Sequence, residues 1–215
     1  MNKIVLIVVA IVSISGVSAQ ISNSLIYVQG GSLNIGGNEL TNESPINTLS
    51  VSSFEITKFP ITVGQYYSFC KETGRSMPKA LKWGWQTNHP MVYMTYYDAL
   101  DYCRWLSKKS GDEYKLPTKA QWEYAALGGA KSKNYLYSGS NNLREVAWVK
   151  ENARGKTNDV GRKKANELGI YDMIGNTMEW TSDRNNSGNP IVKGCSWKTS
   201  GNFCRITDSY HNSPN

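Results

Sequence analysis

The 215-residue chain carries 24 basic and 17 acidic residues, which gives a formal net charge of +7. The excess is modest, and its two clusters, Lys131/Lys133 and Arg162–Lys164, lie in stretches that read as loops. No aromatic-interleaved or helical basic stripe accompanies these clusters, so the composition disfavours nucleic acid as a partner.

The first nineteen residues have the pattern of a secretory signal peptide. Lys3 supplies a positive charge, Ile4–Val12 forms an apolar run, and Val17–Ala19 gives the small-x-small pattern that is cut before Gln20. The apolar run is too short and too soon interrupted to favour a membrane-spanning helix, and an uncleaved anchor is the alternative. We therefore expect cleavage near Ala19 and export to the periplasm, the cell surface or the medium, without a transmembrane span in the mature chain.

The remainder, residues 20–215, suits a single domain with a sizeable core. Alternation of apolar and polar residues predicts a strand over 24–35 that breaks at Gly36-Gly37. A second strand is predicted over 49–59, and its inward-facing candidates are Val51, Phe54 and Ile56.

Three helices are predicted from one repeated start signal. Thr62, Thr95 and Thr118 each stand three residues before a Gln or Asp, which is the pattern of a capping box. In the second helix, Ala99, Tyr102, Cys103 and Leu106 recur at helical spacing, and this helix should end at Gly111. The third should end at Gly128-Gly129. From Ala130 to Asn166 the polar, Gly- and Asn-rich composition predicts long loops with little regular structure.

Four cysteines in an exported chain allow two disulfides with three possible pairings. Cys70 and Cys103 fall on predicted helices in the first half, while Cys195 and Cys204 fall in the last quarter of the chain. A pairing within each half is the simplest arrangement, and the sequence leaves the pairing open.

Three segments in the second half carry a family resemblance. They are Leu116–Gly129 (Leu-Pro-Thr-Lys-Ala-Gln-Trp-Glu-Tyr-Ala-Ala), Asn166–Asp183 (with Gly-Asn-Thr-Met-Glu-Trp) and Val192–Arg205. Together with Tyr27–Gly36 and Phe54–Tyr66, they resemble the formylglycine-generating-enzyme, or sulfatase-modifying-factor, domain family. The resemblance implies an α+β, C-type-lectin-like fold with short strands, about three helices, long loops and low regular secondary structure. It also implies a final strand after the Cys-Arg segment, and the sequence reaches Asn215 before such a strand.

In relatives, the Gly-Asn-x-x-Glu-Trp segment helps to wrap a calcium ion. Carried over by position, the ligands would be Asp172, Glu179 and main-chain carbonyls near Gly175 and Thr177. Carboxylate and carbonyl oxygens suit this hard cation, so we expect a structural calcium site. The alternative is that both acids hold the loop by hydrogen bonds to backbone amides, without a metal.

The chain departs from the family's catalytic pattern. In catalytic relatives, two cysteines separated by four residues hold copper(I), which activates oxygen to oxidise a substrate cysteine. Here the first position falls on Thr199 and only Cys204 falls on the second, so Cys204 is the one candidate catalytic residue and copper is expected only if the chain is an enzyme. Cys195 lies four residues before the proper position, and a Cys195–Cys204 disulfide or two buried thiols are the simpler interpretations.

These observations leave three hypotheses for function. The first is a non-catalytic, exported module that binds a protein or small-molecule ligand through a C-terminal loop face spanning 197–210. Its candidate contacts are Trp197, Asn202, Phe203, Arg205 and Tyr210. Trp197 and Phe203 are equally consistent with core positions. The second hypothesis is a formylglycine-type oxidase or a related metal-dependent oxygenase, and the third is a structural subunit of an envelope assembly.

Overall fold

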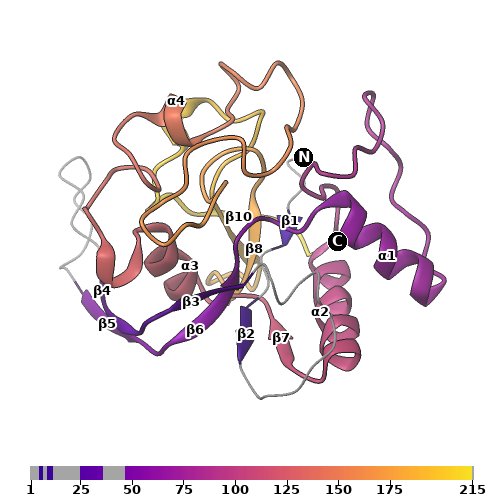
Figure 1. Ribbon diagram of the computed structural model, residues 1–215, viewed down its shortest axis with the longest axis horizontal. Coiled ribbons are helices and arrows are strands. Elements are labelled where there is room, and N and C mark those ends of the chain that lie inside the picture. The colour runs from indigo at the N-terminus through magenta and orange to yellow at the C-terminus, as the bar shows by residue number, and fades with distance from the viewer. Residues whose placement is uncertain (1–4, 7–8, 12–24, 36–46, 215) are drawn as a thin grey trace.

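The computed structural model describes residues 5–6, 9–11, 25–35 and 47–214 (Figure 1). The predicted cleavage site near Ala19 and the predicted break at Gly36-Gly37 lie outside these residues. Within them the fold is mixed α/β, with short strands and helices joined by long loops, as the resemblance implied. None of the helices in the described part of the chain has the length and apolar character needed to cross a bilayer.

All three predicted helices form. They are α1 (Val63–Thr73), α2 (Tyr96–Ser110) and α3 (Lys119–Ala126), and each begins with a complete capping box. The first two end at Gly74 and Gly111, which adopt the left-handed conformation that glycine tolerates best. The apolar stripe predicted on α2 is buried throughout. A fourth, short helix, α4 (Leu143–Val146), lies in the stretch predicted to be loop.

Each predicted strand is divided in two. The first gives β3 (Leu25–Val28) and β4 (Gly31–Ile35), and the second gives β5 (Asn47–Val51) and β6 (Phe54–Thr57). The break between β3 and β4 falls at Gly30, where a Cβ atom would lie 2.6 Å from the Val51 carbonyl oxygen. The inward positions predicted at Val51, Phe54 and Ile56 are buried.

The strands assemble into three small sheets. One has the order β3-β6-β2-β7, with β2 (Val9–Ile11) between β6 and β7 (Glu113–Lys115). A second has the order β1-β8-β9-β10, from β1 (Val5–Leu6), β8 (Glu179–Arg184), β9 (Pro190–Lys193) and β10 (Tyr210–His211). The hairpin β4-β5 forms the third.

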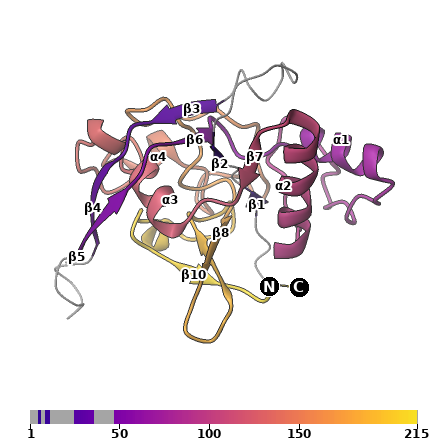
Figure 2. The same ribbon diagram turned by 90° about the horizontal axis from the view of Figure 1, so that it is seen from below.

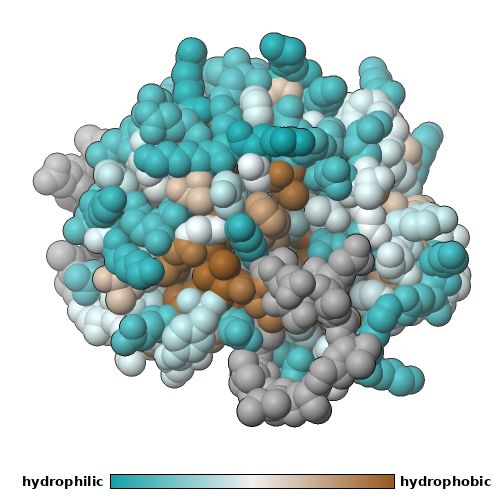
Figure 3. All heavy atoms as spheres, in the orientation of Figure 1, coloured by the Kyte–Doolittle hydropathy of each residue, from teal (hydrophilic) through white to brown (hydrophobic). Residues whose placement is uncertain are grey.

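The buried apolar side chains form two large clusters and a smaller one in the described part of the chain. Helices α1 and α2 pack together beside the second sheet, while α3 lies between the β4-β5 hairpin and β8 (Figure 2) and packs against β5, β8 and β9. Polar side chains cover most of the face shown in Figure 3, and apolar side chains gather near its middle. The long loops from 130 to 178 are thereby held on a scaffold of strands and helices, which positions the candidate site.

A buried ion pair joins α3 to β9. The Lys193 side chain is fully buried, and its ammonium group donates to Glu123 Oε1 at 2.7 Å and to the Asp208 carbonyl at 2.6 Å. Burial lowers the pKa of Lys193 to about 8, although the Glu123 carboxylate opposes this shift. A buried cation without its partner is strongly unfavourable, so the pair holds the C-terminal segment against α3.

We predict that Glu123→Gln lowers the free energy of unfolding by about 3 kcal/mol, because it leaves Lys193 buried without a countercharge. Urea denaturation measures the change. Lys119→Gln is the matched control, since Lys119 lies 3.9 Å from the same carboxylate and is partly exposed; it should cost less than about 1 kcal/mol. Equal losses in the two variants would contradict the role of the pair.

Candidate functional site

The segment from Asp172 to Glu179 forms a buried turn with an unusual backbone. Asp172, Gly175 and Asn176 have φ values of 57°, 81° and 59°, all in the left-handed region. Non-glycine residues adopt this region infrequently, with Asn and Asp the best tolerated. Both are present here at the positions that need them, so the sequence is locally suited to the turn.

The two acids of the turn are buried and close enough to interact. Glu179 Oε2 accepts a hydrogen bond from the Trp122 indole of α3, whereas Glu179 Oε1 is buried without a hydrogen-bond partner. Asp172 Oδ2 accepts from the Gly161 amide at 2.6 Å, and Oδ1 accepts from the Asn176 amide group at 3.4 Å. The interior therefore holds two carboxyl groups with unused acceptor capacity.

Burial governs the pKa of both acids. It raises the pKa of Asp172 to about 6, against the opposing hydrogen bonds from Gly161 and Asn176. Burial also raises the pKa of Glu179 well above its usual value, and the negative charge of Asp172 adds to that rise. Each carboxylate is thus unfavourable in this interior unless a positive charge compensates it.

Backbone oxygen atoms surround the same turn. A Cβ atom on Gly194 would lie 2.8 Å from the Met173 carbonyl oxygen and 3.7 Å from that of Thr177, which requires glycine after β9. The Gly175 carbonyl accepts from the Thr177 amide at 2.6 Å. The predicted set of Asp172, Gly175, Thr177 and Glu179 is therefore brought together in one turn. Its oxygen donors, and the unpartnered Glu179 Oε1, fit a hard cation such as calcium.

The predicted loop face begins with a disulfide. Cys195 and Cys204 are bonded, as one of the simpler interpretations held, with Cα atoms 5.3 Å apart. The simplest pairing of the other two cysteines is wrong: Cys70 and Cys103 are free thiols. Both are buried on the inner sides of α1 and α2, where they pack as small apolar groups among aromatic rings.

Thr199 and Cys204 occupy the two positions at which catalytic relatives hold copper. The Thr199 hydroxyl accepts from the Ser196 amide at 3.1 Å, so it supports a turn within the disulfide loop. Cys204 is committed to Cys195. In this state the protein presents no thiolate at either position, and thiolates are the ligands that hold copper(I) in catalytic relatives.

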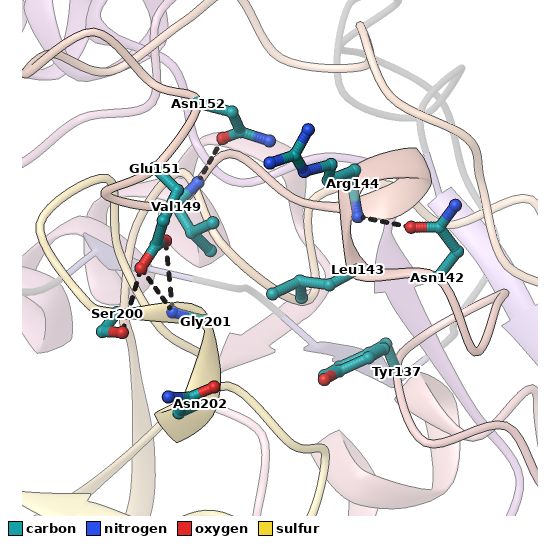
Figure 4. Close-up of a pocket in the computed structure, with 10 residues that line it drawn as sticks. All are labelled: Tyr137, Asn142, Leu143, Arg144, Val149, Glu151, Asn152, Ser200, Gly201 and Asn202. Carbon is teal, nitrogen blue, oxygen red and sulfur yellow. Dashed lines mark hydrogen bonds between the residues drawn. The ribbon is translucent and has the colours of Figure 1, made fainter.

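A pocket of about 310 Å³ lies beside the disulfide loop (Figure 4). Its walls come from two stretches far apart in the sequence, 137–152 and 200–202. Ser200 and Gly201 form one wall, held by the Glu151 carboxylate, which accepts from the Ser200 hydroxyl at 2.9 Å and from the Gly201 amide at 3.2 Å. A hydrogen bond from its own backbone amide lowers the pKa of the Glu151 carboxyl group, and the hydrogen bonds from Ser200 and Gly201 lower it further. Leu143 forms the apolar floor, and a Cβ atom on Gly201 would lie 2.5 Å from it.

The candidate contact residues divide into two groups. Asn202 lines the pocket and is exposed, and Phe203 next to it is 62% exposed. Trp197 is buried in an aromatic cluster with Trp83, which matches the core alternative. Tyr210 donates from its hydroxyl to the Phe203 carbonyl and therefore supports the loop. Arg205 is partly buried, and its amide donates to Asp208 Oδ2 at 2.8 Å.

Several pocket residues come from the segment predicted to be long loops with little regular structure, where no motif in the sequence marks them. They are Tyr137, Asn142, Leu143, Arg144, Val149, Glu151 and Asn152. Val146 and Ala147, which are buried in that segment, belong to the local packing that holds them. Their meeting with 200–202 depends on the fold, so spacing along the chain carries no signal for it.

Comparisons with known proteins agree with this architecture. Residues 14–215 match the family described as "Sulfatase-modifying factor enzyme 1-like domain". The chain is 31% identical over 265 residues to "Chaperone protein LppX" of Paenibacillus barcinonensis, covering 94% of this chain and 91% of that protein. It is 27% identical over 225 residues to the formylglycine-generating enzyme of Mycobacterium tuberculosis, covering 74% and 73%. The solved structure of PvdO from Pseudomonas aeruginosa shares the fold, with a TM-score of 0.76, 22% identity, and coverage of 89% of this chain and 88% of that one.

We predict a characteristic pH dependence in calcium-free buffer containing a chelator. Because the folded-state pKa of Asp172 is raised to about 6 from 3.8, its stabilising contribution is present below pH 3.8 and is lost as the pH rises through 6. Asp172→Asn removes this loss and keeps a side chain that tolerates the left-handed backbone. The variant should gain up to about 3 kcal/mol over the parent protein between pH 4 and pH 7.

Urea denaturation at each pH measures this difference. Asp112→Asn serves as the control, since Asp112 lies at the more exposed turn after α2. Its stability should follow that of the parent at every pH. A constant difference between Asp172→Asn and the parent across the range would contradict the proposed burial of a strained carboxylate.

Proposed function

Because the chain belongs to the sulfatase-modifying factor enzyme 1-like domain family, we propose that it is an exported, non-catalytic binding domain with a protein ligand. One observation carries this proposal: the face that would hold the copper site has Thr199 and a disulfide-bonded Cys204, with an open pocket beside them. A rigid loop face with a pocket but without paired thiolates is suited to recognition.

The chemistry of the pocket supports a polypeptide ligand. Asn202 offers an amide that can pair with a peptide backbone, while Leu143 and Tyr137 offer apolar surface. Phe203, exposed at the rim, is an aromatic anchor of the kind that dominates protein interfaces. The name of the relative LppX, a chaperone protein, points to the same class of ligand.

Export is part of the proposal. The residue pattern of 1–19 supports it, and the Cys195–Cys204 disulfide supports it independently because disulfides persist in oxidising compartments. Cleavage near Ala19 would release the mature domain. In that setting, the loop face would be presented outside the cytoplasm to a protein partner.

We also propose that calcium occupies the turn formed by Asp172–Glu179. The buried, unpartnered Glu179 Oε1 carries this assignment, together with Asp172 and the carbonyl groups near Gly175 and Thr177. The ion would supply the positive charge that both carboxylates lack, and it would act structurally. The turn would then be a support for the loop face, whose Trp197 amide donates to the Asn176 carbonyl at 3.3 Å.

An oxidase is the second candidate function. The similarity to the formylglycine-generating enzyme of Mycobacterium tuberculosis and the retained Cys204 favour it. It would require copper(I) on a freed Cys204 thiolate and a ligand in place of the thiol that Thr199 lacks. The present arrangement of both residues makes binding the better supported function.

We expect calcium at a hundredfold excess over Kd to raise Tm by about 5–10 °C at pH 7.5, since only the folded turn gathers the ligands. Glu179→Gln should abolish this rise while making the calcium-free protein more stable. Differential scanning calorimetry with calcium, magnesium or chelator measures both effects. The rise should shrink at pH 5, where protons compete for the carboxylates. An equal calcium shift in Glu179→Gln and the parent would place the ion elsewhere.

The binding role is tested by photo-crosslinking in the producing cells. We expect a photoreactive residue placed at Asn202 to give a discrete protein adduct, and one placed at the exposed Lys108 of α2 to give none. The partner identified in the adduct is then titrated against purified variants. Asn202→Ala should weaken its binding about tenfold, or about 1.4 kcal/mol, with an unchanged Tm. Lys108→Ala should bind as the parent does. Equal adducts at both positions would contradict a specific loop face.

A further inference from the structure

The N-terminal segment completes two sheets. Val9–Ile11 lies between β6 and β7 and runs antiparallel to both, with Val9 opposite Ile56 on one side and Lys115 on the other. Val5–Leu6 runs parallel to β8. In the described structure, β2 is the only strand that pairs with β7. The central position in this sheet therefore belongs to a strand of three apolar residues.

The same segment has the sequence of a leader that is cut before Gln20. Removal of residues 1–19 would take away β2 while leaving the strands on either side of it. Tyr114 of β7 already exchanges hydrogen bonds with the Ser107 hydroxyl of α2, through its amide at 2.8 Å and its carbonyl at 3.2 Å. By the alternation of a strand, the backbone groups of Glu113 and Lys115 then face the vacated position.

Two strand edges that face one another across the width of a single strand form a specific binding site. Their amide and carbonyl groups need partners, because unpaired buried backbone groups are costly. The side chains beside them include Ile56, fully buried, and Tyr114, 5% exposed, so an apolar strand matches the position. An added strand would gain main-chain hydrogen bonds on both of its edges, twice what addition to an open sheet edge provides.

Resting on the export proposed above, we propose that the position between β6 and β7 is a strand-acceptor site in the mature protein. An extended, apolar segment of a partner protein fills it, antiparallel to both neighbours. The strand in that position, β2, has the sequence Val-Ala-Ile. Glu55 and Glu113 lie opposite its last two residues, so a partner segment with Lys or Arg directly after the apolar run would fit best.

The test uses the exported protein as recovered from culture, with its N-terminus established by intact mass. The probe is a synthetic peptide of residues 3–12 followed by two lysines. Two cysteine pairs are in register: peptide I11C with protein E113C, and peptide V9C with protein K115C. The swapped combinations are out of register and serve as controls. Mild oxidation should crosslink the in-register pairs at least tenfold faster than the swapped pairs.

Each outcome decides the proposal. Register-specific crosslinking to protein that begins at Gln20 supports it, as does tighter binding of the peptide with terminal lysines than of one with terminal glutamates. Recovered protein that retains residues 1–19 would overturn it, because the strand is then supplied by the chain itself. Equal crosslinking of in-register and swapped pairs, or a dimer that excludes the peptide, would also overturn it. Asn202→Ala should crosslink normally, so failure of the loop face and failure of the strand site are distinguishable.

Discussion

The carboxyl group of Glu179, buried at the start of β8, is the constraint on which the loop half of the molecule depends. It binds the Trp122 indole of α3, lies in the turn that begins at Asp172, and keeps one oxygen atom unpartnered. An interior carboxylate of this kind is tolerated only if a proton or a cation neutralises it. The loops around it are long and poor in regular structure. A bound calcium ion would neutralise the buried carboxylate and thereby stabilise the turn.

Hydrogen bonds connect that turn to the loop face. The Asn176 amide donates to the Trp148 carbonyl at 2.7 Å, while the Asn176 carbonyl accepts from Trp197 inside the disulfide loop. Trp148 leads into Val149–Glu151, and the Glu151 carboxylate holds Ser200 and Gly201. A perturbation at the turn would thus reach the pocket through these few hydrogen bonds, with no need for a large rearrangement.

Local signals in the sequence account for the parts of the fold that could be predicted. A capping box spans four residues, so the starts of α1, α2 and α3 were visible without tertiary information. The strand divisions were not visible, because the break at Gly30 is set by the close approach of Val51 from another strand. The proposed calcium ligands lie within eight positions on one turn, and their positions were proposed through the resemblance. The pocket could not be predicted, because it joins segments some fifty residues apart. The strand at Val9–Ile11 could not be predicted either, because the local sequence has the pattern of a signal peptide.

The disulfide links the proposed location to the proposed function. The Cys204 sulfur atom cannot bind copper(I) as a thiolate while it is bonded to Cys195. Cys204 can therefore either close the loop or serve as a copper ligand, but not both. In an oxidising compartment the bond persists, and the loop that carries Asn202 and Phe203 is closed across nine positions. In a reducing compartment the same loop would lose its covalent closure, and Cys195 and Cys204 would both become thiols, while Thr199 would still offer no thiol at the first of the two positions that hold copper in catalytic relatives. Export therefore favours the closed loop, and neither setting supplies a thiolate at both of the positions that hold copper in catalytic relatives.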